Sequence, residues 1–404
     1  MKRKFLVSLL ALLLAITLLG CNNENTEYTD NLTTEEKLED FEYLYQMIYE
    51  NYPFLNPDYG YGTQWLNNKE VFKKQIKETK NDEEFIMAIR KIVESLHQGH
   101  THALDEQSFK MAYSVYSCPE IAELTKPWLE VLNDDKVLKF YNFNPETDIT
   151  ARQIYQSHSP VFESKIIIPN EVAYLKIRKM ETGRIEEDAK GIRTFFEEVK
   201  DYDKLIIDIR GNGGGDTRYW IENVVQPLIR EPLSVEYYSF FRGNYAKPFY
   251  KARGMKLKPL SELEDYMIER IPEEIKTDFD YFNNSKFTIE PLDPVGFEGD
   301  IYLLVDKLVY SAAESFAAFS KDSGFATLVG ESTGRDGIGI DPLLFSLPNS
   351  GIVIRYSGAL ALNGDGTIHQ KVGIVPHVEV DPTVGADFET DTAIQYVINK
   401  GSSH

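Results

Sequence analysis

The fold is decided by the stretch Ile301-Tyr-Leu-Leu-Val305, a short turn, and then Ser311-Ala-Ala-Glu314. The first five residues form the apolar run of a buried strand, and residues Ala312 to Phe319 have the composition of a helix. A serine in the first turn of such a helix presents its hydroxyl beside free backbone N–H groups, as several serine hydrolases present a nucleophile. The alternative is that Ser311 only caps the helix, which is a common role of serine.

Two further strand–helix pairs precede this stretch. A strand is expected at Glu171–Ile177 and an amphipathic helix at Ile185–Val199. A buried strand is expected at Lys204–Ile209, with a helix from about Arg218. Because strands and helices alternate, the second half of the chain is predicted to be α/β.

The glycine-rich turn Gly211-Asn-Gly-Gly-Gly215 joins the strand at Lys204–Ile209 to its helix. A phosphate loop would need a following Lys-Ser/Thr pair, and a dinucleotide-binding fingerprint would need glycine where Asp216 stands. Nucleotide binding is therefore disfavoured. A loop of this kind can bring backbone N–H groups close to a reacting atom, as an oxyanion hole requires. The alternative is a sharp turn that needs glycine only for its shape.

The first hundred residues have a different, helical pattern. Thr33-Thr-Glu-Glu36 is typical of a capping box that opens a helix, and two more helices are expected near Val71–Lys80 and Asp82–Leu96. The predicted organisation is a helical domain at 33–104, an irregular connecting region at 105–165 and a core at 166–395. The connecting region contains a strand candidate at Val137–Phe140. The core carries an aromatic insertion at 231–300, which is expected to shape or cover the site.

Three of the seven histidines fall in Leu96-His-Gln-Gly-His-Thr-His102. Just after a helix end, this cluster suits a loop that presents one imidazole, that of His100, as a general base. Zinc is the alternative, but carboxylates at metal-ligand spacing are not evident, and no metal is predicted. For His97 and His102, packing or surface roles are expected.

The N-terminus has the pattern of an export signal. A basic start and an apolar run from Leu6 to Leu19 precede Gly20-Cys21, so residues 1–20 are interpreted as a signal peptide. Leu18-Leu-Gly-Cys21 resembles a bacterial lipobox, which implies lipid attachment to Cys21, with residues 21–32 as a polar tether. The alternative is an ordinary signal peptide with an incidental cysteine. Cleavage would leave only Cys118 besides Cys21, so no internal disulfide is expected.

Composition limits the classes of partner. The formal net charge is −21 at pH 7, which argues against nucleic acid and against an anionic membrane surface as partners. Membrane attachment would then depend on the lipid alone. Hydrophobic residues make up 42% of the chain, which is enough for one large or two medium domains.

Four motifs in order resemble those of one family, the C-terminal-processing (tail-specific) and tricorn-core serine peptidases. They are Asp208-Ile-Arg-Gly-Asn-Gly-Gly-Gly215, Ser311-Ala-Ala-Glu314, Leu328-Val-Gly-Glu331 and Gly373-Ile-Val-Pro376. The resemblance implies an α/β core, a strand–helix spiral like that of Clp protease and the crotonases. It also implies Ser311 as nucleophile, with the N–H of Ala312 and of Gly215 or Gly214 as oxyanion donors.

The sequence departs from the family's pattern at two of the positions where relatives carry catalytic residues. The processing branch uses a lysine base 25 residues after the serine, and Asp336 stands there instead. The tricorn-like branch uses a histidine in a Gly-His-Thr context, which Gly99-His100-Thr101 matches. That branch orients its histidine with a glutamate where this chain has Gln370, which can accept a hydrogen bond but cannot stabilise imidazolium by charge. The family's PDZ module is not expected in 105–165.

The sequence thus predicts an extracytoplasmic, lipid-anchored serine peptidase of the cell envelope, with Ser311, His100 and Gln370 as its catalytic set. The expected partner is a peptide or unfolded protein, and no cofactor is implied. The competing hypothesis is a weak or inactive family member that binds a ligand or peptide, because a scaffold can be retained without its chemistry.

Overall fold

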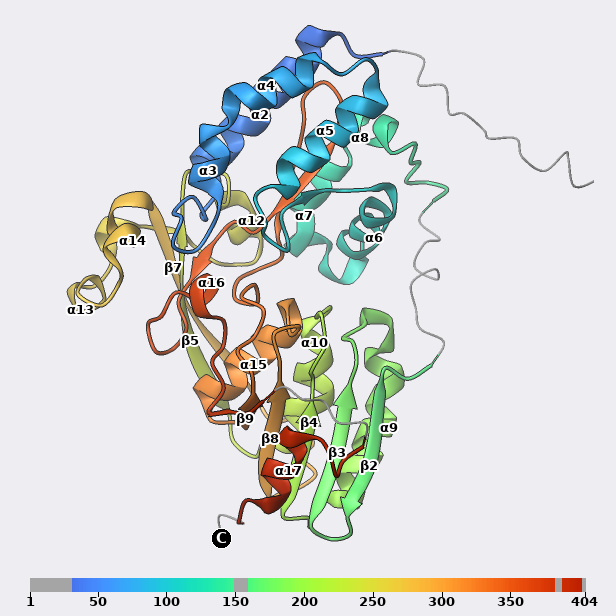
Figure 1. Cartoon of the computed structure of the whole chain (residues 1–404). Coiled ribbons are helices and arrows are strands. Elements are labelled where there is room, and N and C mark those ends of the chain that lie inside the picture. The colour runs from blue at the N-terminus through green and yellow to red at the C-terminus, as the bar shows by residue number, and fades with distance from the viewer. Residues whose placement is uncertain (1–30, 149–158, 382–386, 402–404) are drawn as a thin grey trace, which may run out of the picture.

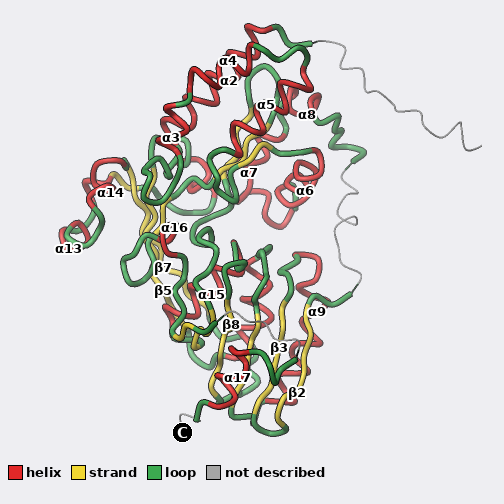
Figure 2. Tube along the Cα trace, in the orientation of Figure 1, coloured by secondary structure: helices red, strands yellow, loops and turns green. Residues whose placement is uncertain are grey.

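The computed structural model describes residues 31–148, 159–381 and 387–401. Figure 1 shows an upper part, made mainly of the N-terminal helices, above a lower part built on a twisted sheet. The colour-coded tube of Figure 2 shows that loops gather where the two parts meet. The signal peptide, Cys21 and most of the tether predicted for 21–32 lie outside the described residues.

The lower part is organised by a six-stranded sheet of order β13-β9-β8-β4-β3-β2. All neighbouring pairs are parallel except β2 with β3. Parallel pairing places the carboxyl ends of β4 and β8 side by side at one edge, which is where sites form in sheets of this kind. The strands are β2 (Phe162–Ile168), β3 (Val172–Ile177), β4 (Lys204–Asp208), β8 (Asp300–Val305), β9 (Thr327–Gly330) and β13 (Val378–Glu379).

Both faces of this sheet are buried, because successive side chains of a strand point to opposite faces. In β4, Leu205 and Ile207 join the core under helices α9 (Ile185–Val199) and α15 (Ser311–Ser323). Ile206, between them, packs in the opposite core with helix α17 (Thr392–Asn399). The α/β class and the strand–helix order predicted from the sequence are confirmed.

The upper part contains the predicted N-terminal helices. The capping box at Thr33 is present, with Glu36 Oε2 accepting from Thr33 N at 2.8 Å, and the helix continues as α2 (Thr34–Asn51). The following helices are α3 (Gly62–Asn67), α4 (Lys69–Lys77) and α5 (Asp82–Glu94). Apolar side chains of α2, α4 and α5 form one buried cluster.

The expectation of irregular chain over 105–165 is wrong for much of that stretch. It contains α6 (Glu106–Tyr116), α7 (Ala122–Leu132) and α8 (Asp135–Phe140). The strand candidate Val137–Phe140 lies within α8, whose N-terminus is capped by Asp134, which accepts from Lys136 N at 2.9 Å. The cap overrides the β propensity of Val137.

The insertion at 231–300 supplies three strands of a four-stranded sheet of order β12-β5-β7-β6, in which β12 is Leu360–Ala361. The two long central strands of this sheet form a ribbon that joins the two parts. Strand β5 (Leu233–Phe241) pairs with β7 (Tyr281–Ile289) over nine positions. Val235 and Ile289 belong to the core of the lower part, whereas Phe240 and Phe282 belong to the core of the upper part. The ribbon is therefore a connection between cores. The remaining elements of this region are α12 (Lys247–Ala252), β6 (Lys258–Pro259), α13 (Asp265–Ile268) and α14 (Glu273–Asp278).

A three-stranded sheet connects the histidine cluster to the C-terminal half. Its order is β1-β11-β10, where β1 is His102–Ala103, β10 is Leu343–Ser346 and β11 is Val353–Tyr356. Strands β10 and β11 pair antiparallel and form a hairpin around Leu347–Gly351. Because β11 is the central strand of its sheet, it leaves no free edge for a substrate strand, whereas β12 is the edge strand of the four-stranded sheet.

Candidate active site

Ser311 is the first residue of α15 and follows the turn after β8. Its φ is +52°, a left-handed conformation that costs a residue with a side chain about 1–2 kcal/mol. Such strain persists only where surrounding contacts impose it, and it is characteristic of a serine held on a sharp strand-to-helix turn. Tyr310 N donates to Asn212 O at 3.2 Å, which ties this turn to the glycine-rich loop.

The glycine-rich loop lies directly against Ser311. A Cβ on Gly214 would lie 2.7 Å from Ser311 Cβ and 2.8 Å from Ala312 N, so only glycine fits there. The loop is anchored by the fully buried Asn212, whose Nδ2 donates to Ile177 O at 3.0 Å. The two segments that the sequence assigned to the oxyanion hole are therefore adjacent.

Their N–H groups are not equivalent. Gly214 N donates to Asn212 Oδ1 at 2.9 Å and is already engaged. Within the described part of the chain, the N–H groups of Gly215 and Ala312 have no protein acceptor. Of the two glycines left open by the sequence, Gly215 is therefore the one with a donor available for an oxyanion.

His100 contacts a carboxylate. Its Nδ1 lies 2.7 Å from Asp336 Oδ2, and the two side chains are only 17% and 9% exposed. Asp336 Oδ1 accepts from Ser357 Oγ at 3.1 Å. The turn that carries the histidine is shaped by Gln98, whose Oε1 accepts from His100 N at 2.9 Å and from Thr101 Oγ1 at 2.8 Å. With Nδ1 directed to Asp336, Nε2 is the nitrogen left for a reacting group.

The electrostatics of this pair favour an ionised carboxylate. Burial raises the pKa of Asp336, but the hydrogen bond from His100, the positive charge of that ring, and the hydrogen bonds from Ser357 and Gln98 outweigh it. The pKa of Asp336 is therefore below its ordinary value. A buried carboxylate kept ionised in this way can stabilise an imidazolium on His100.

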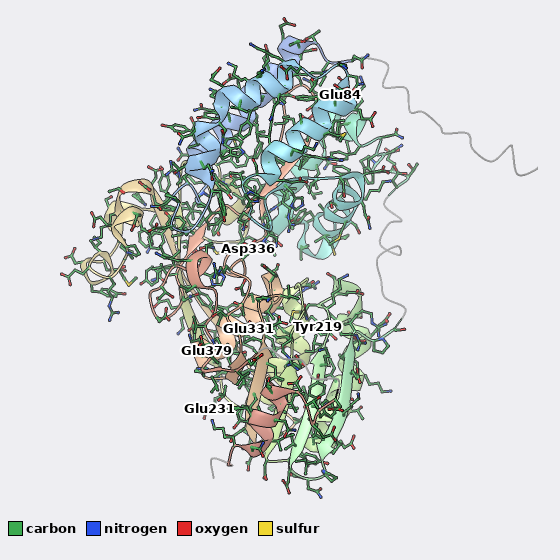
Figure 3. The ribbon with its side chains drawn as sticks, viewed as in Figure 1. Glu84, Tyr219, Glu231, Glu331, Asp336 and Glu379 are labelled. Atoms are coloured by element: carbon green, nitrogen blue, oxygen red, sulfur yellow. The ribbon has the colours of Figure 1, made fainter. Side chains whose placement is uncertain are left out.

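The loop that carries Asp336 is attached to the turn of Ser311. Gly334 N donates to Val309 O at 2.9 Å, just before the serine. Asp336 N donates to Glu314 Oε2 at 2.6 Å, one helical turn after it. Figure 3 accordingly places Asp336 at the junction of the two parts. Over the described residues, no hydrogen bond joins Ser311 Oγ to His100, so the structure brings the histidine's carboxylate to the serine turn without closing a Ser–His contact.

Gln370, the residue expected to orient His100, is occupied elsewhere. It lies in α16 (His369–Val372), and its Oε1 accepts from Ala361 N at 3.2 Å. No contact between Gln370 and His100 is found among the described residues. Sequence reasoning missed Asp336 as the partner, although its position, 25 residues after the serine, already marked the loop from which relatives draw their base.

His97, His102 and His377 contact neighbouring structural elements. The His97 ring lies edge-on to Tyr61, with centroids 5.0 Å apart. His102 pairs across strands with Arg355. His377 Nδ1 accepts from Leu328 N at 2.9 Å. In the described ranges no group of three or more His, Cys, Asp or Glu side chains could hold a metal ion.

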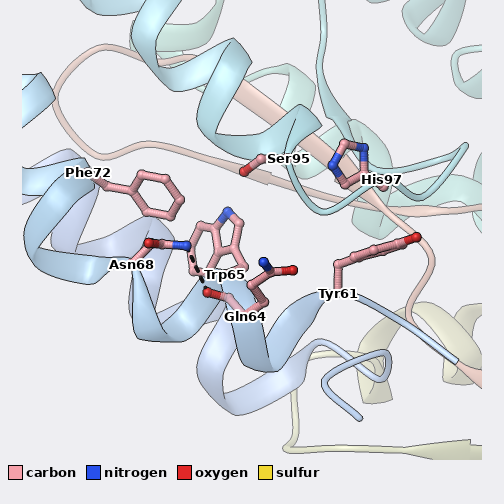
Figure 4. Close-up of a pocket in the computed structure, with 7 residues that line it drawn as sticks. All are labelled: Tyr61, Gln64, Trp65, Asn68, Phe72, Ser95 and His97. Atoms are coloured by element: carbon pink, nitrogen blue, oxygen red, sulfur yellow. Dashed lines mark hydrogen bonds between the residues drawn. The ribbon is translucent and has the colours of Figure 1, made fainter. Parts of the chain in front are cut away.

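A cavity of about 190 Å³ lies next to the histidine turn and is lined by residues of α3, α4 and the end of α5 together with His97. Figure 4 shows its lining, in which polar side chains surround Trp65 and Asn68 Nδ2 donates to the carbonyl oxygen of Gln64 at 3.0 Å. Its lining includes His97 but neither His100 nor Ser311. This cavity is therefore separate from the candidate active site.

A buried ion network supports the base of the glycine-rich loop. Arg210 Nη2 lies 2.8 Å from Asp208 Oδ2 and 2.9 Å from Asp391 Oδ2. All three side chains are at most 7% exposed. The same Arg210 thus fixes the end of β4 and the start of α17.

The chain resembles several known proteins. The sequence pattern of Peptidase family S41 matches residues 171–380, just over half of the chain. A Chlamydia pneumoniae protein is 32% identical over 99 residues, which are 24% of this chain and 16% of that protein, so the chain matches only a small part of the length of this curated relative.

Solved structures share the fold. A protein from Parabacteroides merdae, provisionally described as a peptidase, superposes with a TM-score of 0.57 at 18% identity, over 90% of this chain and 95% of its own. A mutant of CPAF superposes with a TM-score of 0.51 at 12% identity, over 86% and 93%. Because the family pattern runs from β3 through β13, and so includes both segments that meet at Ser311, the chain belongs to peptidase family S41, a family of serine-type peptidases.

Proposed function

We propose that this protein hydrolyses peptide bonds, with Ser311 as nucleophile, His100 as base and Asp336 as the carboxylate that orients His100. The observation that carries the proposal is the 2.7 Å contact of His100 with Asp336, on a loop bonded to the turn of Ser311. Asp336 here takes the role that the sequence suggested for Gln370.

The chemistry follows from the positions of these groups. Ser311 Oγ attacks the carbonyl carbon of the substrate while His100 Nε2 takes the hydroxyl proton. The N–H groups of Gly215 and Ala312 donate to the oxyanion that forms. His100 then gives the proton to the leaving amine, and a water molecule, activated by the same imidazole, releases the acyl group from Ser311. Asp336 stabilises the imidazolium that exists between these steps.

The Ser311–His100 contact has to form during the cycle. Catalytic hydrogen bonds of enzymes without substrate are often long and tighten only when substrate binds. The β5–β7 ribbon and the Asp336 loop link the two parts. In this proposal, a change in the relative position of the two parts brings His100 to Ser311.

The decisive experiment labels the full chain with a fluorophosphonate and measures hydrolysis of fluorescent casein, beside Ser311→Ala and His100→Ala. We expect labelling of the wild type at Ser311, and a loss of at least about 10³-fold in casein hydrolysis for both variants. A folded wild type that neither reacts nor cleaves would contradict the proposal and favour the ligand-binding alternative. Retained activity in His100→Ala alone would show that the base is misassigned.

We propose in addition that the protein acts outside the cytoplasm, attached to a membrane by lipid on Cys21. The support is the sequence Leu18-Leu-Gly-Cys21 after a basic and apolar start. Metabolic labelling with palmitate should mark the wild type but not Cys21→Ala. Equal labelling of both would contradict the proposal. Peptides or unfolded chain ends are the proposed substrates, and nucleic acid is not proposed as a partner because the formal net charge is −21.

A further inference from the structure

We propose that Glu314 is a positioning residue that holds Asp336, and through it His100, against Ser311; this inference rests on the proposed function. Glu314 lies one helical turn after Ser311 and its side chain is fully buried. Its Oε1 accepts from Arg335 N at 2.7 Å and from the Thr333 hydroxyl, and its Oε2 accepts from Asp336 N at 2.6 Å. One carboxylate thus joins the nucleophile's helix to the loop of the orienting carboxylate.

The loop is fixed along its length. Thr333 N donates to Ile374 O at 3.3 Å, and Gly334 N donates to Val309 O at 2.9 Å. After the two N–H groups bound by Glu314, Gly337 N donates to His369 Nε2 at 3.1 Å. Five successive N–H groups are therefore bonded, and Glu314 accepts from two of them. Arg335, at the centre, has a φ of +79°, a conformation that these contacts impose.

His369 is the second side chain that accepts a hydrogen bond from the loop. Its ring is fully buried, and Nε2 accepts from Gly337 N, so the ring proton is assigned to Nδ1, which lies 2.9 Å from Asn363 Oδ1. His369 Nε2 and Glu314 Oε2 are 3.5 Å apart and serve neighbouring N–H donors of the loop. The loop is thus held by two buried side-chain acceptors, of which only Glu314 belongs to the helix of Ser311.

The test variant follows from this pattern. In Glu314→Gln, one carboxylate oxygen becomes an NH₂ group that faces an N–H donor of the loop, so one contact becomes repulsive while side-chain volume is kept. The loop and Asp336 should shift, and a displacement of about 1 Å in a catalytic arrangement can cost about 10²-fold in rate. We expect the maximal rate of fluorophosphonate labelling to fall about 10- to 100-fold, with the half-saturating probe concentration unchanged.

The experiment is a double-mutant cycle on the full chain, with labelling rate as the readout. If Glu314 acts through Asp336, Asp336→Asn combined with Glu314→Gln should react no more than about threefold slower than Asp336→Asn alone. Independent effects, which would multiply in the double variant, would overturn the proposal. Glu331→Gln is the matched control, because the Glu331 carboxylate has no hydrogen bond or ion pair among the described residues, and it should label at the wild-type rate.

A second variant and two controls distinguish the possible outcomes. If Glu314→Gln does not fold, Thr333→Val enters the same cycle and is expected to show a smaller, equally non-additive loss. This variant removes one donor to Glu314 together with the acceptor of Ile374 N, which lies 2.8 Å from the Thr333 hydroxyl. If Ser311→Ala labels like the wild type, the proposed function and this inference both fail. If Ser311 and His100 are required but Glu314→Gln reacts normally, only the positioning role fails.

Discussion

The two sides of the proposed active site are built differently. The side of the nucleophile is local: β4, β8 and their following turns are neighbours in one sheet, and the glycine-rich loop touches Ser311 directly. The side of the base is assembled from segments far apart in the chain, because His100 depends on Asp336, Ser357 and the pairing of β1 with β11. A short motif predicts each segment of the first arrangement, whereas no short motif predicts which segments meet in the second.

The comparison is tested most strongly by removing the charge of Asp336. Asp336→Asn keeps size but cannot stabilise imidazolium and allows the wrong histidine tautomer, so we expect a loss of about 10³- to 10⁴-fold in casein hydrolysis. Gln370→Ala is the matched comparison and should lose less than about tenfold. The reverse order of the two losses would return the orienting role to Gln370.

On the side of the nucleophile, the largest expected effect is on stability. Arg210→Met would leave the buried Asp391 without a cation and Asp208 with only Lys176 Nζ, at 3.4 Å; removing one partner of a buried ion pair typically costs about 3–5 kcal/mol. Urea unfolding measures this change in the free energy of unfolding. Arg230→Met, at a half-exposed ion pair with Glu298, should cost less than about 1 kcal/mol. Equal costs would mean that the buried network does not stabilise the loop.

A smaller effect is expected from crowding the nucleophile. Gly214→Ala adds a Cβ 2.7 Å from Ser311 Cβ at a φ of +96°, and we expect a destabilisation of about 1–3 kcal/mol together with lower labelling of Ser311. Gly211→Ala is the control, because its φ is also positive but no atom lies within 4 Å of the added carbon. If Gly214→Ala and Gly211→Ala are labelled at equal rates, the close approach of residue 214 does not affect the reactivity of Ser311.

The smallest expected effect is the contribution of His102, which lies two residues after the proposed base His100, to the pH dependence of stability. Burial first, and then the charges of Arg355 and His100, lower the pKa of His102 to about 4. The folded protein therefore keeps His102 neutral at a pH where the unfolded chain, with an ordinary pKa of 6.5, binds a proton. Stability should fall as the pH drops from 6.5 toward 4. Thermal unfolding of His102→Gln should show a weaker pH dependence over this window; an unchanged slope would assign it to other groups.

The sequence predicted the nucleophile's side more completely than the base's side, and the reason is physical. Apolar strands with a period of two and glycines at a close approach leave local signals, so β4, β8, α9 and the turn at Ser311 were predicted within a few residues. The pairing of β1 with β11 and the contact of His100 with Asp336 depend on tertiary packing, for which no local pattern exists. The helices at 106–140 were missed because their caps were not recognised as such.

The joining of β1 to β11 has a consequence for when the protein becomes active. Gln98, which shapes the histidine turn, bonds Ser357 across 259 residues, so this contact closes one of the longest loops in the chain. In the proposed mechanism, a chain still emerging from the ribosome carries His100 early but lacks Asp336, and the Ser357 that contacts both Gln98 and Asp336, until residues 336–357 have followed. The topology thus delays activity, and hydrolysis begins only after the chain as far as residue 357 is available to fold.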